Sequence, residues 1–457
     1  MTFQRFATVL LFLAIATAAC LMPAQSDTFW QLSAGRDMVA SGRVMLHDAF
    51  TYSVRGGYWP NHEWLSEVLF YGLWRAGGMP ALAAFAASMV VLAWTLVWRV
   101  MTGPALWRCA LVLLVVIPCA KLWSIRPQVI SFALLAALVV LMCRGRWRFV
   151  PLLFVVWANL HGGAMLGMVA LTGALAARVA TTRTRTSLGA SAALWVLSAA
   201  AVCLTPLGTT IWTEVPHMLA RLRSYGVAEW RPVDLADPAN IPFLVVAPAL
   251  VTLALARWRQ LDGPQAVLVG ASLALLAPAL ESDRNVSSFL LAAVPALSGL
   301  ARDLPARFAR DEPAGGTRRH TVLAATISAG CFALIAWTWI RPPARLNWTP
   351  VPAAVAAAVE GCSGNLYNQY DNGGYLTWFV PGRPVFIDSR QDPFPSDLVL
   401  AHRSAELTGE YRQLFERFQV RCAALPPVSR TAVALRREGW QVLAEDREWV
   451  VLSQPKS

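Results

Sequence analysis

Charge is scarce in this chain. Only 14% of its 457 residues are Asp, Glu, Lys or Arg, whereas 56% are hydrophobic; soluble domains have nearer to a quarter charged residues. Lysine is almost missing, because only Lys121 and Lys456 occur among the 39 basic residues. The net charge of +12 is carried by arginines in short loops between apolar segments, so it predicts membrane topology and no nucleic-acid partner. The composition is typical of a polytopic membrane protein.

Strong signatures of cofactor chemistry are missing too. The sequence has no strong metal-ligand spacing, no glycine-rich phosphate loop and no nucleophile elbow. Six of the eight cysteines lie in or beside apolar segments, so they do not form a disulfide framework. Only Cys362 and Cys422 lie in the tail, where one disulfide can form. We therefore expect no cofactor, although a divalent metal is left open.

Long apolar runs dominate the rest of the chain. Runs of roughly 20 residues, separated by short charged segments, predict membrane-spanning helices. We expect about eleven spans, and about ten to twelve are compatible with the pattern. The predicted spans lie near residues 6–23, 80–100, 104–121, 128–143, 148–160, 163–180, 188–206, 241–257, 263–281, 285–301 and 320–340.

Basic residues recur in every second loop, with the longest basic stretch at 302–319. Because positive charge marks the cytoplasmic side, the N-terminus is expected in the cytoplasm. The loops 24–79 and 207–240 and the tail after Ile340 are then external. An alternative for the first span is a cleaved signal peptide, since Thr17–Cys20 resembles a weak lipoprotein cleavage site.

The composition changes from about Trp348, where alternating apolar segments suit a small α/β domain. The predicted fold is thus an all-α polytopic membrane domain at 1–341 with a small extracytoplasmic α/β domain at 342–457. Helices are expected near 394–418 and 430–438.

Two further details are predicted for the tail. The apolar segment PVFI at 384–387 is expected to be an inner strand. The pair Gly373-Gly374 indicates a turn with close backbone packing. Three charged residues are expected at the end of the strand: Asp388, Arg390 and Asp392.

The first external loop gathers acids, histidines and aromatic residues beside the membrane. Such groups are costly there and more often serve chemistry than packing. Asp27 has two interpretations of equal weight. With Ser26 it can cap an interfacial helix over 28–41 that Gly42 ends, or it can be a catalytic carboxylate. One residue can do both.

Asp48 and the pair His62-Glu63 complete the acidic group of this loop. These residues either take part in catalysis and substrate binding or order the loop through hydrogen bonds. For Asp48 and for the pair taken alone, the ordering role is favoured.

Later external loops contribute basic residues. Arg126 and Arg284 lie at predicted outer boundaries of spans, where an arginine either extends to the lipid headgroups or holds a phosphate through two hydrogen bonds. His161 lies in a tight turn with Gly162 and Gly163, where a structural role is favoured over ligand binding. The 207–240 loop adds further polar residues, among them Glu214, Arg221 and Glu229.

Short patches along the whole chain carry a family resemblance. They are DTFWQLSAGR, HDAFTYS, NHEWLSEVL, RPQ, NLHGG, YDNGGYLTWF and FIDSRQDPF. The order resembles that of bacterial membrane proteins related to the GT-C superfamily of lipid-phosphosugar-dependent glycosyltransferases, which includes the mannosyltransferase and aminoarabinose-transferase-like families. The resemblance implies many spans, essential acids in the first outer loop and a bacterial inner (plasma) membrane location. It gives Asp27 the first-loop acid role, with Asp48 or Glu63 as second candidates.

The resemblance also implies an inverting transfer of a sugar from a polyprenyl-phosphate donor to an external acceptor. Asp27 would then accept the acceptor's proton, while Arg126 and Arg284 neutralise the departing phosphate. Acids of the first loop, namely Asp27, Asp48 and Glu63, can hold a metal through oxygen ligands. His62 and His161 are the remaining candidate substrate-binding residues.

Two other classes of protein are weighed against this enzyme. A transporter is disfavoured, because charged residues at mid-span and broken helices are expected there, whereas these spans are nearly free of charge. A non-enzymatic scaffold or assembly protein acting through its outer domain is the stronger alternative. Its binding surface would be formed by YDNGGYLTWF and FIDSRQDP.

Overall fold

The computed structural model describes the chain except residues 122, 225–227, 302–316 and 456–457. Most of the predicted basic stretch at 302–319 therefore lies outside the described residues. Contacts divide the chain into two compact units: unit 1 comprises residues 1–22, 80–211 and 226–342, and unit 2 comprises residues 23–79, 212–225 and 343–457. These units group the first long loop with the tail; the domain division at residue 341 stays a prediction.

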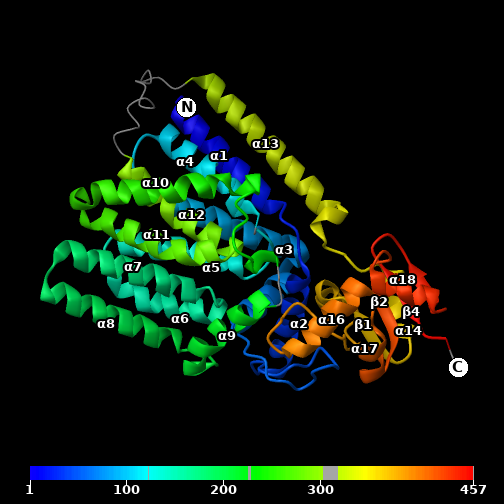
Figure 1. The fold of residues 1–457 in the computed structure, drawn as a ribbon. Coiled ribbons are helices and arrows are strands. Elements are labelled where there is room, and N and C mark those ends of the chain that lie inside the picture. The colour runs from blue at the N-terminus through cyan, green and yellow to red at the C-terminus, as the bar shows by residue number, and fades with distance from the viewer. Residues whose placement is uncertain (122, 225–227, 302–316, 456–457) are drawn as a thin grey trace. The chain divides into compact units, whose positions relative to one another are not determined.

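Unit 1 is a bundle of apolar helices (Figure 1). All of the predicted spans coincide with described helices. These helices are α1 (Phe3–Cys20), α3 (Trp64–Trp98), α4 (Ala105–Ala120), α5 (Gln128–Cys143), α6 (Val150–Leu160), α7 (Ala164–Thr182), α8 (Arg185–Val202), α10 (Ile241–Arg257), α11 (Gly263–Glu281), α12 (Asp283–Leu300) and α13 (Arg318–Ile340). Only α3 extends into unit 2, and it is kinked at Gly77 and Gly78, where the backbone is not helical.

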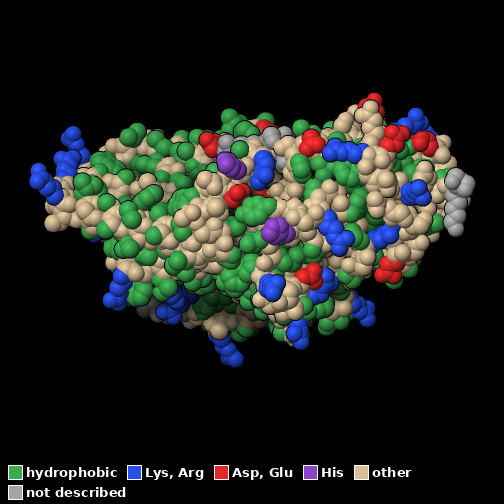
Figure 2. All heavy atoms as spheres, turned by 90° about the horizontal axis from the view of Figure 1, so that it is seen from below, with side chains coloured by type: hydrophobic (Ala, Val, Ile, Leu, Met, Phe, Trp, Pro, Cys, Tyr) green, Lys and Arg blue, Asp and Glu red, His purple; other side chains and the backbone are tan. Residues whose placement is uncertain are grey.

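Seven of the described helices, counting α10 with its flanking turns, are long and apolar enough to cross a membrane. Helices α4, α5 and α6 are shorter but apolar. Large hydrophobic side chains remain exposed on the long apolar helices, such as Phe332 on α13 and Leu255 on α10. Hydrophobic side chains also cover broad areas of the face in Figure 2. The chain is therefore a multi-pass membrane protein, whereas the number of spans stays a prediction.

Small residues set the closest helix packing in unit 1. Helices α7 and α11 lie side by side (Figure 1), and a Cβ atom on Gly173 would lie 2.2 Å from the carbonyl oxygen of Gly270. Only glycine permits this approach, as is common between membrane helices. At the end of α1, the indole of Trp339 donates to the carbonyl of Cys20 at 2.9 Å, which ties α1 to α13.

Unit 2 combines the first loop, α9 and the tail around a small sheet. Within the described part of the tail the sheet has four strands in the order β1-β2-β4-β3. Strands β1 and β2 are parallel, and the other neighbours are antiparallel. The elements are α2 (Ser26–Ser41), α9 (Ile211–Ser224), α14 (Ala353–Gly361), β1 (Asn365–Asn368), α15 (Gly373–Phe379), α16 (Ser396–Thr408), α17 (Arg412–Arg417), β2 (Val420–Leu425), α18 (Arg430–Arg437), β3 (Gln441–Glu445) and β4 (Val450–Ser453).

Several local predictions for unit 2 are confirmed. Helix α2 ends at Gly42, whose φ of 66° lies in the left-handed region that glycine adopts freely. Helices α16 and α17 lie within 394–418, and α18 lies within 430–438. The disulfide between Cys362 and Cys422 is present, and it links the end of α14 to β2.

Two local predictions for the tail are wrong. The segment 384–387 is not a sheet strand, because β4 takes the inner place beside β2. It instead runs beside the first loop, where Val385 donates to the carbonyl of Phe50 at 3.0 Å and its own carbonyl accepts from Tyr52 at 3.1 Å. The Gly373-Gly374 pair begins α15 rather than forming a turn.

The expected close packing of these glycines is nevertheless found. A Cβ atom on Gly374 would lie 2.2 Å from the carbonyl oxygen of Ser26, and one on Gly373 would lie 2.1 Å from that of Ile387. The capping role predicted for Asp27 is wrong, since Gln25 occupies the cap position and forms a capping box with Thr28.

Candidate functional site

Two arginines of unit 1, predicted together as phosphate partners, converge on one carboxylate. Arg126 lies in the turn between α4 and α5, and Arg284 lies in the first turn of α12. The Nη2 atom of Arg126 is 3.0 Å from Oε1 of Glu229, and Nη1 of Arg284 is 3.1 Å from Oε2. Glu229 belongs to the short helix η3 (Ala228–Trp230) of the 207–240 loop. These three residues form the two-arginine cluster.

In the two-arginine cluster, the charges of the arginines affect the pKa of Glu229 more than burial does. Burial by itself would raise the pKa of the Glu229 carboxyl, but the charges and hydrogen bonds of Arg284 and Arg126 hold this pKa below its usual value. Glu229 is therefore ionised at neutral pH. The cluster keeps a formal charge of +1, from two guanidinium groups and one carboxylate, and the Glu229 side chain is 30% exposed.

Neighbouring polar groups fix the two guanidinium planes. Nε of Arg126 donates to Oγ of Ser124 at 2.8 Å. Nη2 of Arg284 donates to Oε1 of Gln128 at 3.3 Å, and its guanidinium stacks over the ring of Trp230 at 4.9 Å. Both arginines are thus oriented from two sides by groups of the protein itself.

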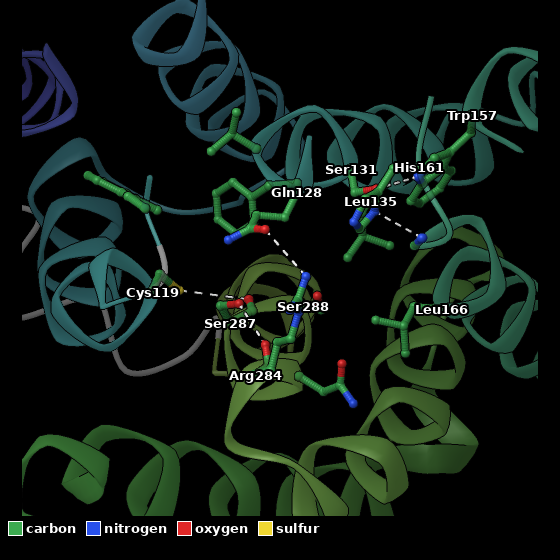
Figure 3. A pocket seen from close by; sticks show the side chains of 15 residues that line it. Cys119, Gln128, Ser131, Leu135, Trp157, His161, Leu166, Arg284, Ser287 and Ser288 are labelled. Carbon is green, nitrogen blue, oxygen red and sulfur yellow. Dashed lines mark hydrogen bonds between the residues drawn. The ribbon is translucent and has the colours of Figure 1, made fainter. Parts of the chain in front are cut away.

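Arg284 also lines a small pocket of about 70 Å³ in unit 1 (Figure 3). The lining is mainly apolar, with Gln128 and Arg284 on one side and Ser131 and His161 on another. Its apolar lining beside the cation of Arg284 suits contact with a ligand that joins a hydrocarbon part to an anionic part.

His161 is held in one tautomer at this pocket. Its Nδ1 accepts from the backbone N–H of Gly163 at 2.9 Å and lies 2.7 Å from Oγ of Ser131, which itself accepts from the indole of Trp157. A neutral ring with Nδ1 as acceptor carries its proton on Nε2. A Cβ atom on Gly163 would lie 2.4 Å from Oγ of Ser131, which explains the glycine. These contacts support the structural role that the sequence favoured.

In unit 2, Asp27 lies in the first turn of α2 and faces the tail. Its Oδ1 accepts from the indole of Trp30 at 3.2 Å and from Oγ of Ser389. Burial raises the pKa of the Tyr375 phenol to about 12, and the negative charges of Asp27 and Asp371 add to this shift. Asp27 is half-buried and thus combines a negative charge with access to solvent.

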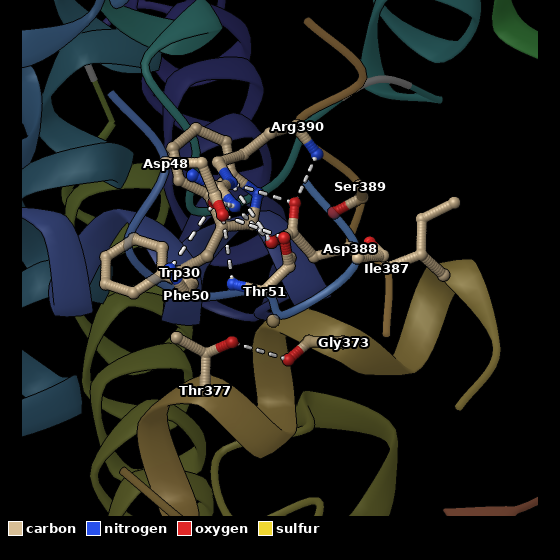
Figure 4. Close-up of polar contacts among 12 residues, drawn as sticks. Trp30, Asp48, Phe50, Thr51, Gly373, Thr377, Ile387, Asp388, Ser389 and Arg390 are labelled. Atoms are coloured by element: carbon tan, nitrogen blue, oxygen red, sulfur yellow. Dashed lines mark hydrogen bonds and ion pairs between the residues drawn. The ribbon is translucent and has the colours of Figure 1, made fainter. Parts of the chain in front are cut away.

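Asp48 belongs to a different arrangement (Figure 4). It accepts from N and Oγ1 of Thr51 at 3.2 and 2.8 Å and from the guanidinium of Arg390. Arg390 also donates to Asp388 at 2.7 Å, and the rings of Phe50 and Trp59 flank it. The side chains of Arg390, Asp48 and Asp388 are fully buried. These three residues form the two-aspartate cluster, which ties the loop to the tail.

Glu63 lies next to a second group of polar residues in unit 2. Its Oε2 accepts from Gln31 at 2.9 Å, and Nε2 of His62 lies 3.7 Å from Oε1. The neighbouring Asn61 donates to Glu67 at 2.8 Å, and Glu67 is completely buried. Glu67 was not predicted as a site residue, although it follows Glu63 by four residues and its N–H donates to the Glu63 carbonyl at 3.1 Å, where α3 begins.

The tail adds one acid whose place the sequence did not reveal. Asp392 is buried, and its Oδ1 lies 3.4 Å from Nη2 of Arg221 in α9. Burial raises its pKa to about 6, while the charges of His62 and Arg221 counteract the shift. Asp392 was predicted only as the end of a strand, because nothing in the sequence joins it to His62 or α9.

The predicted site residues therefore separate into several groups. Arg126 and Arg284 meet at Glu229, while Asp48 is engaged by Arg390 and Asp27 by Ser389. Across the described residues, no three His, Cys, Asp or Glu side chains are placed to hold a metal ion together. Asp27, Asp48 and Glu63 thus do not form the joint metal site left open by the sequence.

Solved structures with the same architecture are known, although no protein-family model and no curated protein matches the chain. The archaeal oligosaccharyltransferase AglB from Archaeoglobus fulgidus, in complex with an inhibitory peptide and a dolichol-phosphate, is similar at 12% identity and a TM-score of 0.58; the match covers 92% of this chain and 69% of AglB. ArnT from Cupriavidus metallidurans in the apo state matches at 15% identity and a TM-score of 0.52, over 98% and 99% of the two chains.

Both neighbours belong to the GT-C superfamily of polytopic glycosyltransferases. At these identities the likeness concerns the fold. The chain therefore has the GT-C fold, as the sequence resemblance implied.

Proposed function

We propose that the protein is a membrane glycosyltransferase that moves a sugar from a polyprenyl-phosphate donor to an extracytoplasmic acceptor with inversion at the anomeric carbon. The observation that carries the proposal is the convergence of Arg126 and Arg284 on one carboxylate, on a GT-C fold. Two guanidinium groups fixed around one anion are suited to phosphate oxygens. The apolar lining of the small pocket beside Arg284 suits contact with the first carbon atoms of a lipid tail.

The reaction needs a group that accepts a proton and groups that stabilise a leaving phosphate. The acceptor hydroxyl oxygen forms a bond to the anomeric carbon while the bond from that carbon to the phosphate oxygen breaks. The hydroxyl proton passes to a carboxylate, and the bonding electrons leave with the polyprenyl phosphate. The negative charge that develops on the phosphate is stabilised by Arg126 and Arg284.

Asp27 is the proposed base, with Glu63 as the second candidate. Asp27 is half-buried, and its hydrogen bonds from Trp30 and Ser389 hold the carboxylate in one orientation. Asp48 is the weakest of the predicted acids, because Arg390 and Thr51 already bind its carboxylate in a fully buried setting. His62 beside Glu63 is proposed to contact the substrate.

We propose a bacterial inner membrane location with unit 2 on the outer side. Reporter fusions after Arg319 and after Ser457 should then report opposite sides of the membrane. Same-side signals would contradict this topology.

The activity test uses membranes that contain the full chain and a labelled sugar on polyprenyl phosphate. Asp27→Asn keeps the size of the side chain but removes the base, so transfer should fall by about 10²- to 10⁴-fold. Arg126→Ala and Arg284→Ala should each reduce it by about 10²- to 10³-fold.

The matched control is Asp37→Asn. Asp37 lies on the same helix as Asp27, pairs with Arg36 at 2.8 Å and is partly exposed, so this variant should transfer sugar like the wild type. Full activity in Asp27→Asn would remove this residue from the mechanism. An inactive wild type across a panel of donors would favour the scaffold alternative.

A further inference from the structure

The two-arginine cluster already holds an anion of its own. Each carboxylate oxygen of Glu229 accepts from a different arginine, at 3.0 Å from Arg126 and 3.1 Å from Arg284. Carboxylate and phosphate offer guanidinium groups the same kind of paired oxygen acceptors. An incoming phosphate and Glu229 therefore require the same donor atoms.

The setting of Glu229 differs from that of a permanently buried ion pair. Its side chain is 30% exposed, whereas Asp48, Asp388 and Arg390 are fully buried. A partly exposed carboxylate can exchange its protein partners for water, whereas Arg126, whose side chain is only 7% exposed, needs another anion in its place.

Near neutral pH, protonation does not release Glu229 from the two arginines. The pKa of Glu229 is held below its usual value despite burial, so the competing group stays negatively charged. A ligand must therefore displace it by offering more charge or further contacts.

We propose that Glu229 is an internal competitor that determines which anions the two arginines accept. The donor is a phosphate diester with one negative charge, like Glu229, and it adds a hydrocarbon chain that contacts the apolar lining of the small pocket beside Arg284. It displaces the carboxylate, whereas small free anions do not. After transfer, the return of Glu229 to the arginines promotes release of the polyprenyl phosphate. This inference rests on the proposed function.

The experiment measures binding to the full chain in phosphatidylcholine nanodiscs, with undecaprenyl phosphate as one probe and inorganic phosphate as the other. The wild type should bind only the lipid probe. Glu229→Gln removes the competing charge and keeps the side-chain size. It should bind undecaprenyl phosphate about tenfold more tightly, as expected when the competent state is populated about 10% of the time in the wild type, and it should also bind inorganic phosphate.

Asp237→Asn is the matched control. Asp237 lies in the same loop and pairs with Lys121 at 3.0 Å, so this variant loses the same charge without touching either arginine. Its affinity should equal that of the wild type. If Glu229→Gln is poorly folded, Glu229→Asp replaces it, because a side chain shorter by one methylene cannot bridge both arginines; it should bind the lipid probe more tightly than the wild type.

The outcomes separate this inference from the proposed function. If the wild type binds undecaprenyl phosphate and Arg126→Ala does not, while Glu229→Gln is unchanged or weaker, Glu229 orients the arginines and the competitor model is wrong. An equal tightening in Asp237→Asn would show a general charge effect and would also overturn it. If no folded variant and no wild type binds the lipid probe, the proposed function fails, and the inference fails with it.

Discussion

The two ion-pair clusters of this protein have opposite compositions. The two-arginine cluster places two guanidinium groups around one carboxylate, and its acid is 30% exposed. The two-aspartate cluster places two carboxylates around one guanidinium, and all of its side chains are fully buried. The first has spare positive charge and access to solvent, so it can exchange partners. The second has neither, so its contribution is to the fold.

The comparison explains why residue type alone does not identify a catalytic acid. Asp27 and Asp48 both lie in the first loop, and both resemble functional acids in sequence. Asp48 is fully buried with Arg390, and burial also raises the pKa of its neighbour Asp388. A carboxylate enclosed in this way cannot meet an acceptor molecule, whereas the half-buried Asp27 can.

The largest expected effect tests whether the two-aspartate cluster stabilises the fold. Arg390→Met leaves Asp48 and Asp388 buried without their cation and should destabilise the fold by about 3–5 kcal/mol. Arg126→Met leaves Glu229 partly exposed and still bound to Arg284, so the loss should be about 1 kcal/mol or less. Thermal unfolding of the two purified full-length variants checks this difference. Equal losses would mean that the composition of a cluster does not predict its role.

A smaller effect is expected where the first loop packs against the tail. Gly374→Ala would place a Cβ atom 2.2 Å from the carbonyl oxygen of Ser26, and the required shift should cost about 1–3 kcal/mol. Gly361→Ala is the control, because a Cβ atom there meets nothing within 4 Å. A fall in the unfolding midpoint for Gly374→Ala alone is the expected result. Unchanged midpoints in both variants would show that the contact is loose.

An effect of the same size as that of Gly374→Ala, but limited to part of the pH range, concerns Asp392, which lies between the two extremes: its carboxyl is buried, but its partner Arg221 is 35% exposed. Burial raises the pKa of Asp392 to about 6, above the value of about 3.9 for an unfolded chain. The folded state therefore favours the protonated form. This stabilisation is complete below about pH 4 and is lost as the pH rises through about 6.

Asp392→Asn should remove this pH dependence. Relative to the wild type, the variant should gain about 1–3 kcal/mol of stability between pH 4 and pH 8. Unfolding measured at both pH values checks the prediction, with Asp397→Asn, an exposed acid of the tail, as the control. Identical pH dependence in wild type and Asp392→Asn would show that the carboxyl is ionised throughout.

The sequence allowed the helices and the fold to be predicted because their signals are local. An apolar run of about 20 residues indicates a spanning helix by itself, and Gly42 ends α2 as a local rule requires. The strand predicted at 384–387 was wrong because its apolar residues pack against Phe50 and Tyr52 of the distant first loop. No pattern within the segment distinguishes that partner from a sheet.

The same difference between local signals and contacts with distant segments applies to the candidate site. The sequence singled out Arg126 and Arg284 because each lies at the end of a span, and the family resemblance implied a shared role for them at the phosphate. It did not reveal that Glu229 joins them, because the 207–240 loop has no periodic pattern that fixes its position. The burial of Asp48 and Glu67 was equally hidden, because it depends on Arg390 and Asn61 reaching them in the folded unit.

Unit 2 is built from three separate segments of the chain, and this limits how many times the chain can cross the membrane between them. Residues 23–79, 212–225 and 343–457 belong to one compact body, which we propose to lie wholly on the outer side of the membrane. The chain must therefore cross the membrane an even number of times between residues 79 and 212, and again between residues 225 and 343. The predicted spans in these intervals satisfy both conditions without any reference to charge. An odd crossing in either interval would require unit 2 to come apart.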